Sequence, residues 1–195
     1  MGRPSASERK PYNMDAIVDV AVQVFLRRGY DGASLDQVAE AAGITKASIY
    51  YHASGKEALL ARGVGRALDA LFAVLEEPAA QSGPAIDRLC HVMRRTVEIT
   101  ATRLPEVALL LRVRGNTPTE RSLLARRREF DHLVATIVAQ AQAAGEVRAD
   151  LDAGLVTRLL FGMLNSITEW YRPGGGLSAK DIVAAATRIA FDGLK

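Results

Sequence analysis

The sequence predicts an all-α protein of about nine helices. Apolar residues recur at spacings of three and four along most of the chain, and β-branched residues never gather into the alternating runs typical of strands. Glycine, proline and N-capping side chains separate these amphipathic stretches, as expected where helices begin and end. We expect a small three-helix domain over residues 1–56 and a larger helical domain over residues 57–195.

The first two helices have clear boundaries in the sequence. A helix over residues 14–28 carries a single apolar face, and Gly29 is expected to end it in a left-handed conformation. Ser34 and Gln37 have the spacing of a capping box, which predicts that a short helix begins at residue 35 and runs to residue 42.

The following helices are marked by similar signals. Gly43 ends the second helix, and Thr45 caps a third over residues 46–52. Later starts are marked by Ser54 with Glu57, Thr117 with Glu120, and Ser178 with Asp181. The remaining helices are expected over residues 54–77, 85–103, a short stretch from 105, 118–145, 151–171 and 179–194.

The composition is that of a folded protein. Of 195 residues, 49% are hydrophobic and 24% are charged, which is too apolar for a disordered chain. The single cysteine excludes an intrachain disulfide and a cysteine-rich metal cluster. Because no apolar run is long enough for a membrane span and no signal peptide is evident, we expect a cytoplasmic protein with no membrane partner.

The second and third helices have the layout of a helix-turn-helix. Gly43 allows the sharp turn between them, and Ile44 fills the joint. Small alanines on the facing sides permit a close approach of the two helices. The outward face of residues 46–52 is then free to enter a major groove of DNA.

That face carries residue types suited to DNA. Thr45 stands at a helix start, where free N–H groups attract phosphate; Lys46 adds charge; and small side chains can touch base edges. Taken singly, the aromatics also fit a core role, His52 a structural histidine and Lys56 a solvated charge. The candidate contacts are Arg3, Ser34, Thr45, Lys46, Ala47, Ser48, Tyr50, Tyr51, His52 and Lys56.

Net charge alone does not single out this domain. Residues 1–60 contain seven Lys or Arg and seven Asp or Glu, so their formal charge is zero. The positions of the charged residues nevertheless favour DNA binding, since Lys46 and Lys56 border the third helix. Arg3 lies on an N-terminal arm that either enters a minor groove or remains a solvated tail.

Residues 33–60 read ASLDQVAEAAGITKASIYYHASGKEALL, follow FLRRGYDG, and resemble the N-terminal domain of TetR-family transcriptional regulators. The number of helices and the chain length agree with that family. The resemblance places its DNA-contacting positions on Thr45, Lys46, Ala47, Tyr50, His52 and Lys56. One departure is Ala53, where the family usually has an aromatic residue.

A single recognition helix buries little groove surface, so we expect a homodimer that reads a palindromic operator in double-stranded DNA. The last two helices carry more apolar surface than one intrachain face needs, although a well-buried core is the plain alternative. In the family, the corresponding helices form a four-helix bundle between subunits. The candidate interface residues are Leu155, Leu159, Gly162, Met163, Ser166, Ile182, Ala186 and Ile189.

The resemblance also implies an effector pocket between residues 85 and 144, whose small hydrophobic ligand releases the operator. The candidate lining residues are Met93, Val97, Leu110, Arg112, Phe130, Asn165 and Trp170, each of which also fits ordinary core. The stretch GEVRADLDAGLVTRLLFGMLNSITEWYRPGGGLSAKDI is similar to TetR-family repressors of fatty-acid and steroid-ring catabolism, which respond to acyl-CoA thioesters.

The acyl-CoA interpretation has candidate phosphate ligands and open alternatives. Arg112, Arg114, Arg121 and residues 126–128 either meet a CoA phosphate or form solvated helix faces. The alternatives are a repressor of an efflux pump that responds to lipophilic drugs, and a DNA-binding regulator without a small-molecule effector.

An enzyme is not expected. Cys90 and His91 are neighbours in sequence, and adjacent helical residues point about 100° apart, so they cannot act as a thiolate and its base. The histidines lack metal-ligand spacing, and no strand precedes a glycine-rich phosphate loop. We therefore predict no catalytic residues, no metal and no cofactor.

Overall fold

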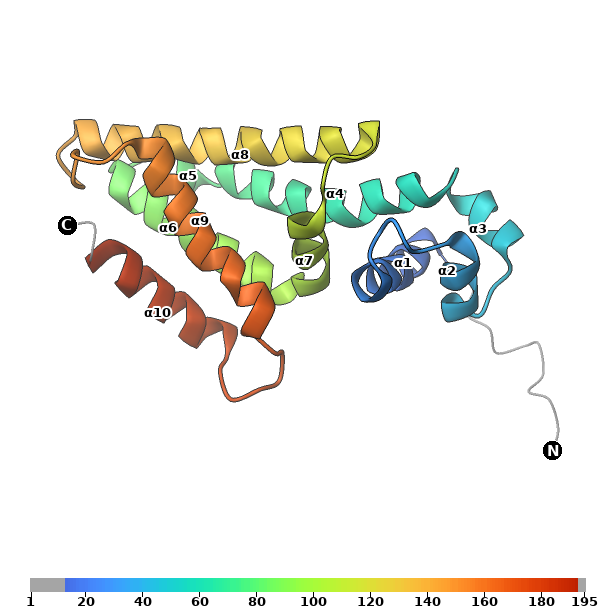
Figure 1. Cartoon of the computed structure of the whole chain (residues 1–195). Coiled ribbons are helices and arrows are strands. Elements are labelled where there is room, and N and C mark those ends of the chain that lie inside the picture. Colours follow the sequence, from blue (N-terminus) through green and yellow to red (C-terminus); the bar gives the residue numbers. More distant parts are fainter. Residues whose placement is uncertain (1–12, 193–195) are drawn as a thin grey trace. The chain divides into compact units, whose positions relative to one another are not determined.

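The computed structural model describes residues 13–192, and within that range it is all-helical, which confirms the predicted fold class (Figure 1). One helix more than the expected nine is present in the described chain, because the segment interpreted as a break contains the short α5. The helices are α1 (Met14–Arg28), α2 (Leu35–Ala42), α3 (Lys46–His52), α4 (Lys56–Leu75), α5 (Pro78–Gln81), α6 (Ala85–Thr102), α7 (Leu104–Arg112), α8 (Pro118–Ala143), α9 (Ala153–Trp170) and α10 (Ala179–Asp192).

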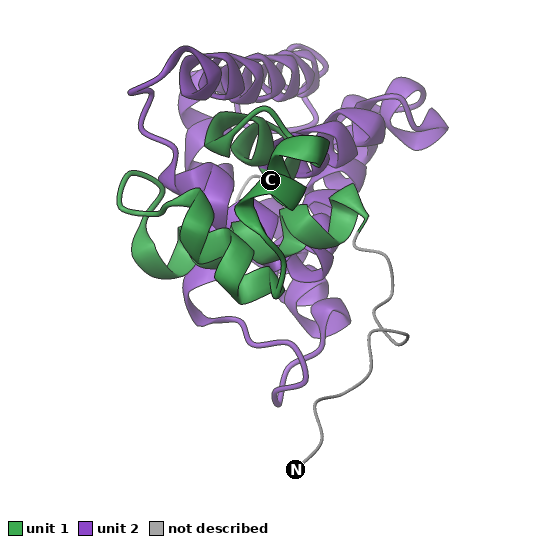
Figure 2. Cartoon of the chain, turned by 90° about the vertical axis from the view of Figure 1, so that its right-hand side faces the viewer, with its two compact units in different colours: residues 1–63 green, residues 64–195 purple. Residues whose placement is uncertain are grey.

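The chain divides into two compact units (Figure 2). The division falls between residues 63 and 64, within α4, whereas the sequence suggested a boundary at residue 56. Among the described helices, none is both long and apolar enough to cross a bilayer.

Local capping explains where the first helices begin. The side chain of Asn13 accepts a hydrogen bond from the backbone N–H of Ala16 at 2.9 Å. The capping box of α2 is confirmed, with Ser34 Oγ accepting from Gln37 N at 3.3 Å and Gln37 Oε1 accepting from Ser34 N at 3.1 Å.

The two glycines that end these helices differ. Gly43 adopts the left-handed helical conformation, with φ 66° and ψ 30°, as predicted. Gly29 has φ 75° but ψ 146°, so the expectation of a left-handed cap there was wrong. The chain leaves α1 extended into the next loop, where the carbonyl of Gly29 accepts from the N–H of Ala33 at 3.1 Å.

The core of the first unit fixes the third helix. Ile49 is fully buried, together with large apolar side chains from α1, α2 and α4. The fit against α4 is tight, since a Cβ built on Gly63 would lie 2.6 Å from Cγ2 of Val22. The buried members of this core include Ile17, Val18, Val22, Phe25, Val38, Ile49, Leu59 and Leu60.

In the second unit, α6 packs against α8, α9 and α10, and α9 crosses α6 obliquely in Figure 1. Aromatic side chains from three helices meet in this core: the ring of Phe130 lies 5.7 Å from that of Phe72 and 5.6 Å from that of Phe161. The apolar stripes predicted on these helices therefore face one another.

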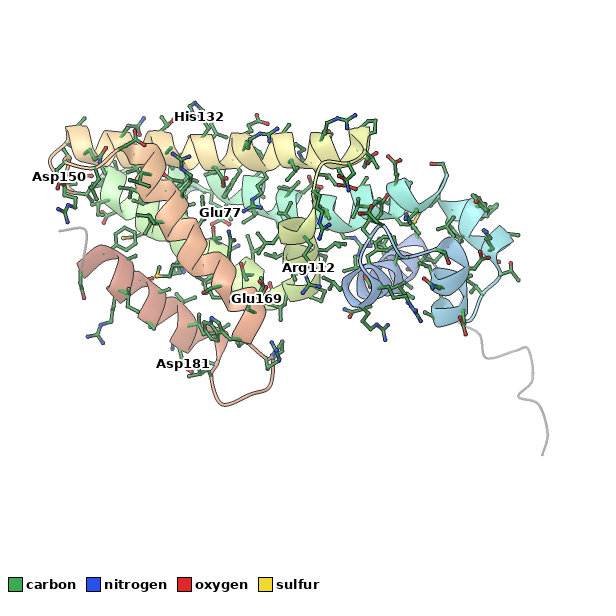
Figure 3. The ribbon with its side chains drawn as sticks, in the orientation of Figure 1. Glu77, Arg112, His132, Asp150, Glu169 and Asp181 are labelled. Atoms are coloured by element: carbon green, nitrogen blue, oxygen red, sulfur yellow. The ribbon has the colours of Figure 1, made fainter. Side chains whose placement is uncertain are left out.

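Two carboxylates accept hydrogen bonds from backbone N–H groups near helix starts, one before α8 and one in the first turn of α6. Glu120 is buried and accepts hydrogen bonds from the backbone N–H groups of residues 114, 115 and 116 at 3.2, 2.7 and 3.0 Å. The first turn of α6 lacks a local side-chain cap, and Glu146 Oε2 accepts from Ile86 N at 2.8 Å instead. At the start of α10, Asp181 (Figure 3) completes the predicted capping box with Ser178.

Candidate nucleic-acid interface and effector cavity

The third helix presents one face to the core and the other to solvent. Ile49 and Ala53 are buried, and Ala53 occupies the position where the resemblance expected an aromatic residue. Lys46 and Ala47 are exposed on the opposite face. The first turn of α3 therefore presents a basic and a small side chain to solvent, which are residue types that can contact DNA.

Two tyrosines extend this outward face. Tyr50 is 53% exposed and Tyr51 is 86% exposed, so the core alternative for these aromatics was wrong. The ring of Tyr51 lies edge-on to His52, with 5.1 Å between the ring centroids. Both hydroxyl-bearing side chains are therefore accessible to a phosphate or a base edge, as predicted contacts with DNA require.

The hydroxyl groups near α3 act as helix caps. Thr45 Oγ1 accepts from Ser48 N at 3.1 Å, and the two hydroxyls are 2.8 Å apart. Ser34 has the same capping role in α2. These residues set where the helices begin, and their predicted contacts with DNA remain predictions.

Lys46 is paired within the domain. Its Nζ lies 2.9 Å from Oδ2 of Asp36 at the start of α2, and this hydrogen bond raises the pKa of Lys46 above its ordinary value. Both side chains are exposed, so the ion pair is weak and Lys46 can leave Asp36 for another partner. A phosphate and Asp36 would compete for the same ammonium group.

Lys56 has a structural role that the sequence did not indicate. Its Nζ donates to the carbonyl oxygens of Tyr30, Ala33 and Asp31 at 2.8, 3.0 and 3.4 Å, and lies 4.5 Å from the centroid of the Tyr30 ring. The ammonium group thereby fixes the loop between α1 and α2. A phosphate contact, which was predicted here, would have to replace one of these carbonyl groups. Arg3, a further candidate contact, lies outside the described residues.

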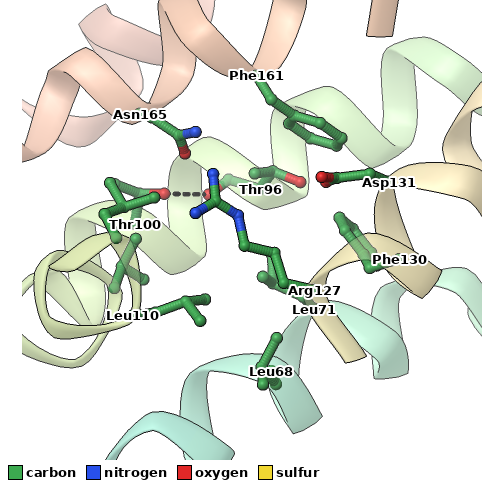
Figure 4. A pocket seen from close by; sticks show the side chains of 12 residues that line it. Leu68, Leu71, Thr96, Thr100, Leu110, Arg127, Phe130, Asp131, Phe161 and Asn165 are labelled. Atoms are coloured by element: carbon green, nitrogen blue, oxygen red, sulfur yellow. Dashed lines mark hydrogen bonds between the residues drawn. The ribbon is translucent and has the colours of Figure 1, made fainter. Parts of the chain in front are cut away.

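The second unit contains a small cavity of about 30 Å³ between helices from α4 to α9 (Figure 4). Of the predicted pocket residues, Leu110, Phe130 and Asn165 line it. Met93 and Val97 are buried in the surrounding core but are not lining residues. The complete lining is Leu68, Leu71, Thr96, Thr100, Val107, Leu110, Leu111, Arg127, Phe130, Asp131, Phe161 and Asn165.

Two predicted pocket residues lie elsewhere. Arg112 is exposed on α7 (Figure 3). Trp170 is 49% exposed and lines a surface groove between α9 and α10 instead. Neither side chain lines this cavity, and their predicted contact with an effector remains a prediction.

The arginines proposed for a CoA phosphate have different surroundings. Arg126 pairs with Asp69 at 2.8 Å and lies over the ring of Phe72. Arg121 donates to two backbone carbonyl groups, while Arg114 and Arg128 are exposed. Only Arg127, among the members of the 126–128 run, lines the cavity.

The groove between α9 and α10 has a volume of about 280 Å³ and is mostly apolar. Leu159 and Ile189 are 62% and 69% exposed on these helices, whereas Ile182 is buried beneath the groove. The lining residues are Met163, Leu164, Ser166, Ile167, Trp170, Leu177, Asp181, Ile182, Ala185, Ala186 and Ile189. A patch of this kind marks a surface that another molecule covers.

Comparison with known proteins identifies the family. Residues 17–62 match the model of bacterial regulatory proteins of the tetR family, and residues 82–194 match a tetracyclin repressor-like C-terminal domain. The chain belongs to the TetR family. The predicted resemblance is confirmed over both units.

Several TetR-family proteins are similar over most of the chain. The crystal structure of SCO3833 from Streptomyces coelicolor A3 is 52% identical, with a TM-score of 0.88, and covers 100% of this chain and 96% of its own. The HTH-type transcriptional repressor KstR2 of Rhodococcus jostii is 27% identical over 91% of this chain and 89% of its own. AibR, solved with isovaleryl coenzyme A and operator DNA, is 25% identical, with a TM-score of 0.78, over 91% and 97% of the two chains.

The ion pair at α3 of this TetR-family protein gives a testable prediction. Asp36→Asn releases Lys46 for phosphate, so we expect tighter binding to any duplex, a salt slope steeper by about one unit, and an unchanged preference for the operator. Fluorescence anisotropy with operator and scrambled duplexes at several salt concentrations measures all three. Glu40→Gln, on an exposed part of α2, is the matched control. An unchanged slope in Asp36→Asn would contradict the competition.

The cavity of this TetR-family protein contains a perturbed carboxyl group. Burial raises the pKa of Asp131, and the nearby charge of Arg127 only partly opposes this. A carboxyl group whose pKa is higher in the folded than in the unfolded state binds its proton more tightly when folded. It therefore destabilises the fold as pH rises from the ordinary Asp pKa through the raised value.

We expect Asp131→Asn to be more stable than the wild type at pH 8 and equally stable at a pH below the ordinary Asp pKa. The gain is a few degrees in melting temperature or less, because part of the carboxylate contacts solvent. Thermal melting across pH 3 to 8 measures it, with the exposed Glu129→Gln on the same helix as the control. The same difference in melting temperature between Asp131→Asn and the wild type at every pH would contradict a raised pKa of Asp131.

Proposed function

We propose that this protein is a homodimeric transcriptional repressor. It binds a palindromic operator through α3 and leaves it when a small hydrophobic effector, an acyl-CoA thioester, binds the second unit. The observation that carries the DNA-binding part is the two-sided α3, with Ile49 buried and Tyr51 on the outward face 86% exposed. The family assignment supports the regulatory role.

The apolar groove between α9 and α10 supports the homodimer. Its exposed leucine and isoleucine side chains need a cover, and the small residues Gly162 and Ser166 permit a second helix to approach closely. A second copy of the same face would cover both grooves through a two-fold axis. The same axis would present two copies of α3 to the two halves of a palindrome.

The effector assignment rests on the cavity and on similarity. The cavity is lined by leucine and phenylalanine side chains together with polar side chains from α6, α8 and α9, as a site for an amphipathic molecule would be. AibR, which is similar over 91% of this chain, was solved with isovaleryl coenzyme A and operator DNA. The acyl chain of the effector would contact the apolar walls, and the CoA portion would extend into solvent.

Thermal melting with a panel of ligands tests the proposal. An effector raises the melting temperature by mass action, and the same compound must release the operator in an anisotropy assay. The panel contains isovaleryl-CoA, a long-chain acyl-CoA, a steroid-derived acyl-CoA, free CoA and lipophilic drugs. Stabilisation and release by an acyl-CoA but not by free CoA is the expected result. Release by the drugs alone, or by no compound, would overturn the acyl-CoA assignment and leave DNA binding intact.

A further inference from the structure

Three polar side chains converge on the cavity of the second unit without a partner of their own. Arg127 and Asp131 reach it from α8, and Asn165 from α9 (Figure 4). Within residues 13–192, the side chains of these three residues form no hydrogen bond or ion pair. All three side chains are half-exposed, and a few polar groups placed at the edge of an apolar cavity are what orient a ligand in such a site.

A purely structural role does not account for them. Where arginines of this chain stabilise the fold, they pair closely: Arg126 lies 2.8 Å from Asp69, and Arg148 lies 2.7 Å from Asp150. Arg127 follows Arg126 directly and has Asp131 one helical turn away, yet the two do not form an ion pair. Both side chains are instead available to a molecule in the cavity.

The two threonines in the lining restrict the chemistry further. Thr96 Oγ1 donates to the carbonyl of Val92 at 2.8 Å, and Thr100 Oγ1 donates to the carbonyl of Thr96 at 2.9 Å. Their hydroxyl hydrogens are therefore used within α6. The free donors at the cavity are the guanidinium of Arg127 and the amide of Asn165, and the charged acceptor is Asp131.

We propose that this site recognises a hydroxylated acyl group. The acyl carbonyl or carboxylate oxygen accepts hydrogen bonds from Arg127, and the hydroxyl group of the ligand donates to Asp131. Residues four apart on a helix lie on the same face, so Arg127 and Asp131 can contact one ligand at the same time. The hydrocarbon part contacts the apolar walls, which include Leu68, Leu71, Leu110, Phe130 and Phe161.

Entry of this ligand requires the lining side chains to move. The cavity of about 30 Å³ holds one or two water molecules, well below the roughly 300 Å³ of a small ligand site. The long, half-exposed side chain of Arg127 can rotate at little cost. The inference deepens the proposed function, since it names the chemistry of the effector that the second unit binds.

Calorimetry on the full chain tests this with four probes: 3-hydroxydecanoic acid, decanoic acid and the CoA thioester of each. We expect the hydroxylated member of at least one pair to bind five- to ten-fold more tightly. Asp131→Leu removes the acceptor at similar size and should reduce that preference to less than two-fold. Arg127→Gln should weaken both members about ten-fold, while Glu129→Gln, at an exposed position of the same helix, leaves all affinities unchanged.

Equal affinity for the two members of both pairs, or a preference that persists in Asp131→Leu, would overturn the inference. Absence of binding by all four probes would overturn it as well. Should Asp131→Leu fail to fold, the wild-type preference and Arg127→Gln decide. If the hydroxylated and plain acyl-CoA bind equally and both release the operator, this inference fails while the proposed function stands.

Discussion

Leu159→Glu is expected to convert the dimer into monomers and to weaken operator binding at least 100-fold. Leu159 is 62% exposed on α9, beside a groove that a second copy would cover. A carboxylate at this position would be buried without a partner in the dimer, whereas in the monomer it remains solvated. Losing the second half-site removes the gain from bivalent binding, which is commonly 10²- to 10⁴-fold.

Sedimentation and anisotropy measure the two effects on the same sample. Arg128→Glu, which introduces an equally exposed carboxylate on α8, is the matched control and should remain dimeric. Leu159→Glu should retain its helical content, because the side chain contributes little to the core. A variant that stays dimeric, or a monomer with full operator affinity, would contradict the proposed interface.

Tyr51→Ala is expected to weaken operator binding by about 10- to 100-fold, which corresponds to roughly 1.4 to 2.8 kcal/mol. The side chain is 86% exposed and its ring lies edge-on to that of His52, so its loss should leave the melting temperature nearly unchanged. Anisotropy with operator DNA and thermal melting separate the two outcomes. Thr136→Ala, on an exposed part of α8, is the control. A fall in stability that accounts for the lost affinity would contradict a direct role in binding.

The DNA-binding unit was largely predictable because its signals are local. Ser34 with Gln37 and Thr45 with Ser48 are separated by three residues, so the helix starts follow from neighbouring positions in the sequence. Gly43 likewise indicates the turn, because glycine readily adopts the left-handed conformation that the turn requires. The ion pair of Lys46 joins positions ten residues apart and was not foreseen.

The hydrogen bonds that the sequence did not predict, in either unit, join residues far apart in the chain. Lys56 was interpreted as a phosphate ligand because its partners, the carbonyls of the loop at residues 30–33, carry no side-chain signal. Glu146 caps α6 from 60 residues away, and no local pattern in the sequence indicates this contact either. No local pattern predicts contacts of this kind.

The cavity was predicted only in part. Helical periodicity indicates which side of a helix faces inward, but it does not show which inward residues leave a gap. Met93 and Val97 follow the apolar stripe of α6 and are packed in the core, whereas Thr96 and Thr100 line the cavity on the same helix. Polar residues one helical turn apart on an inward face, as Arg127 and Asp131 are, were the signal that could have indicated the site.

Operator recognition by a dimer can be measured as binding of the full chain to three duplexes: an inverted repeat from the region upstream of its own gene, one half-site, and a scrambled sequence. We expect two chains to bind the inverted repeat, with half-sites spaced by about one helical turn or a multiple, at least 100-fold more tightly than the scrambled duplex. We also expect Tyr51→Ala to remove most of this preference. Equal binding to the inverted repeat and the scrambled duplex, or no binding to either in low salt, would contradict operator recognition by a dimer.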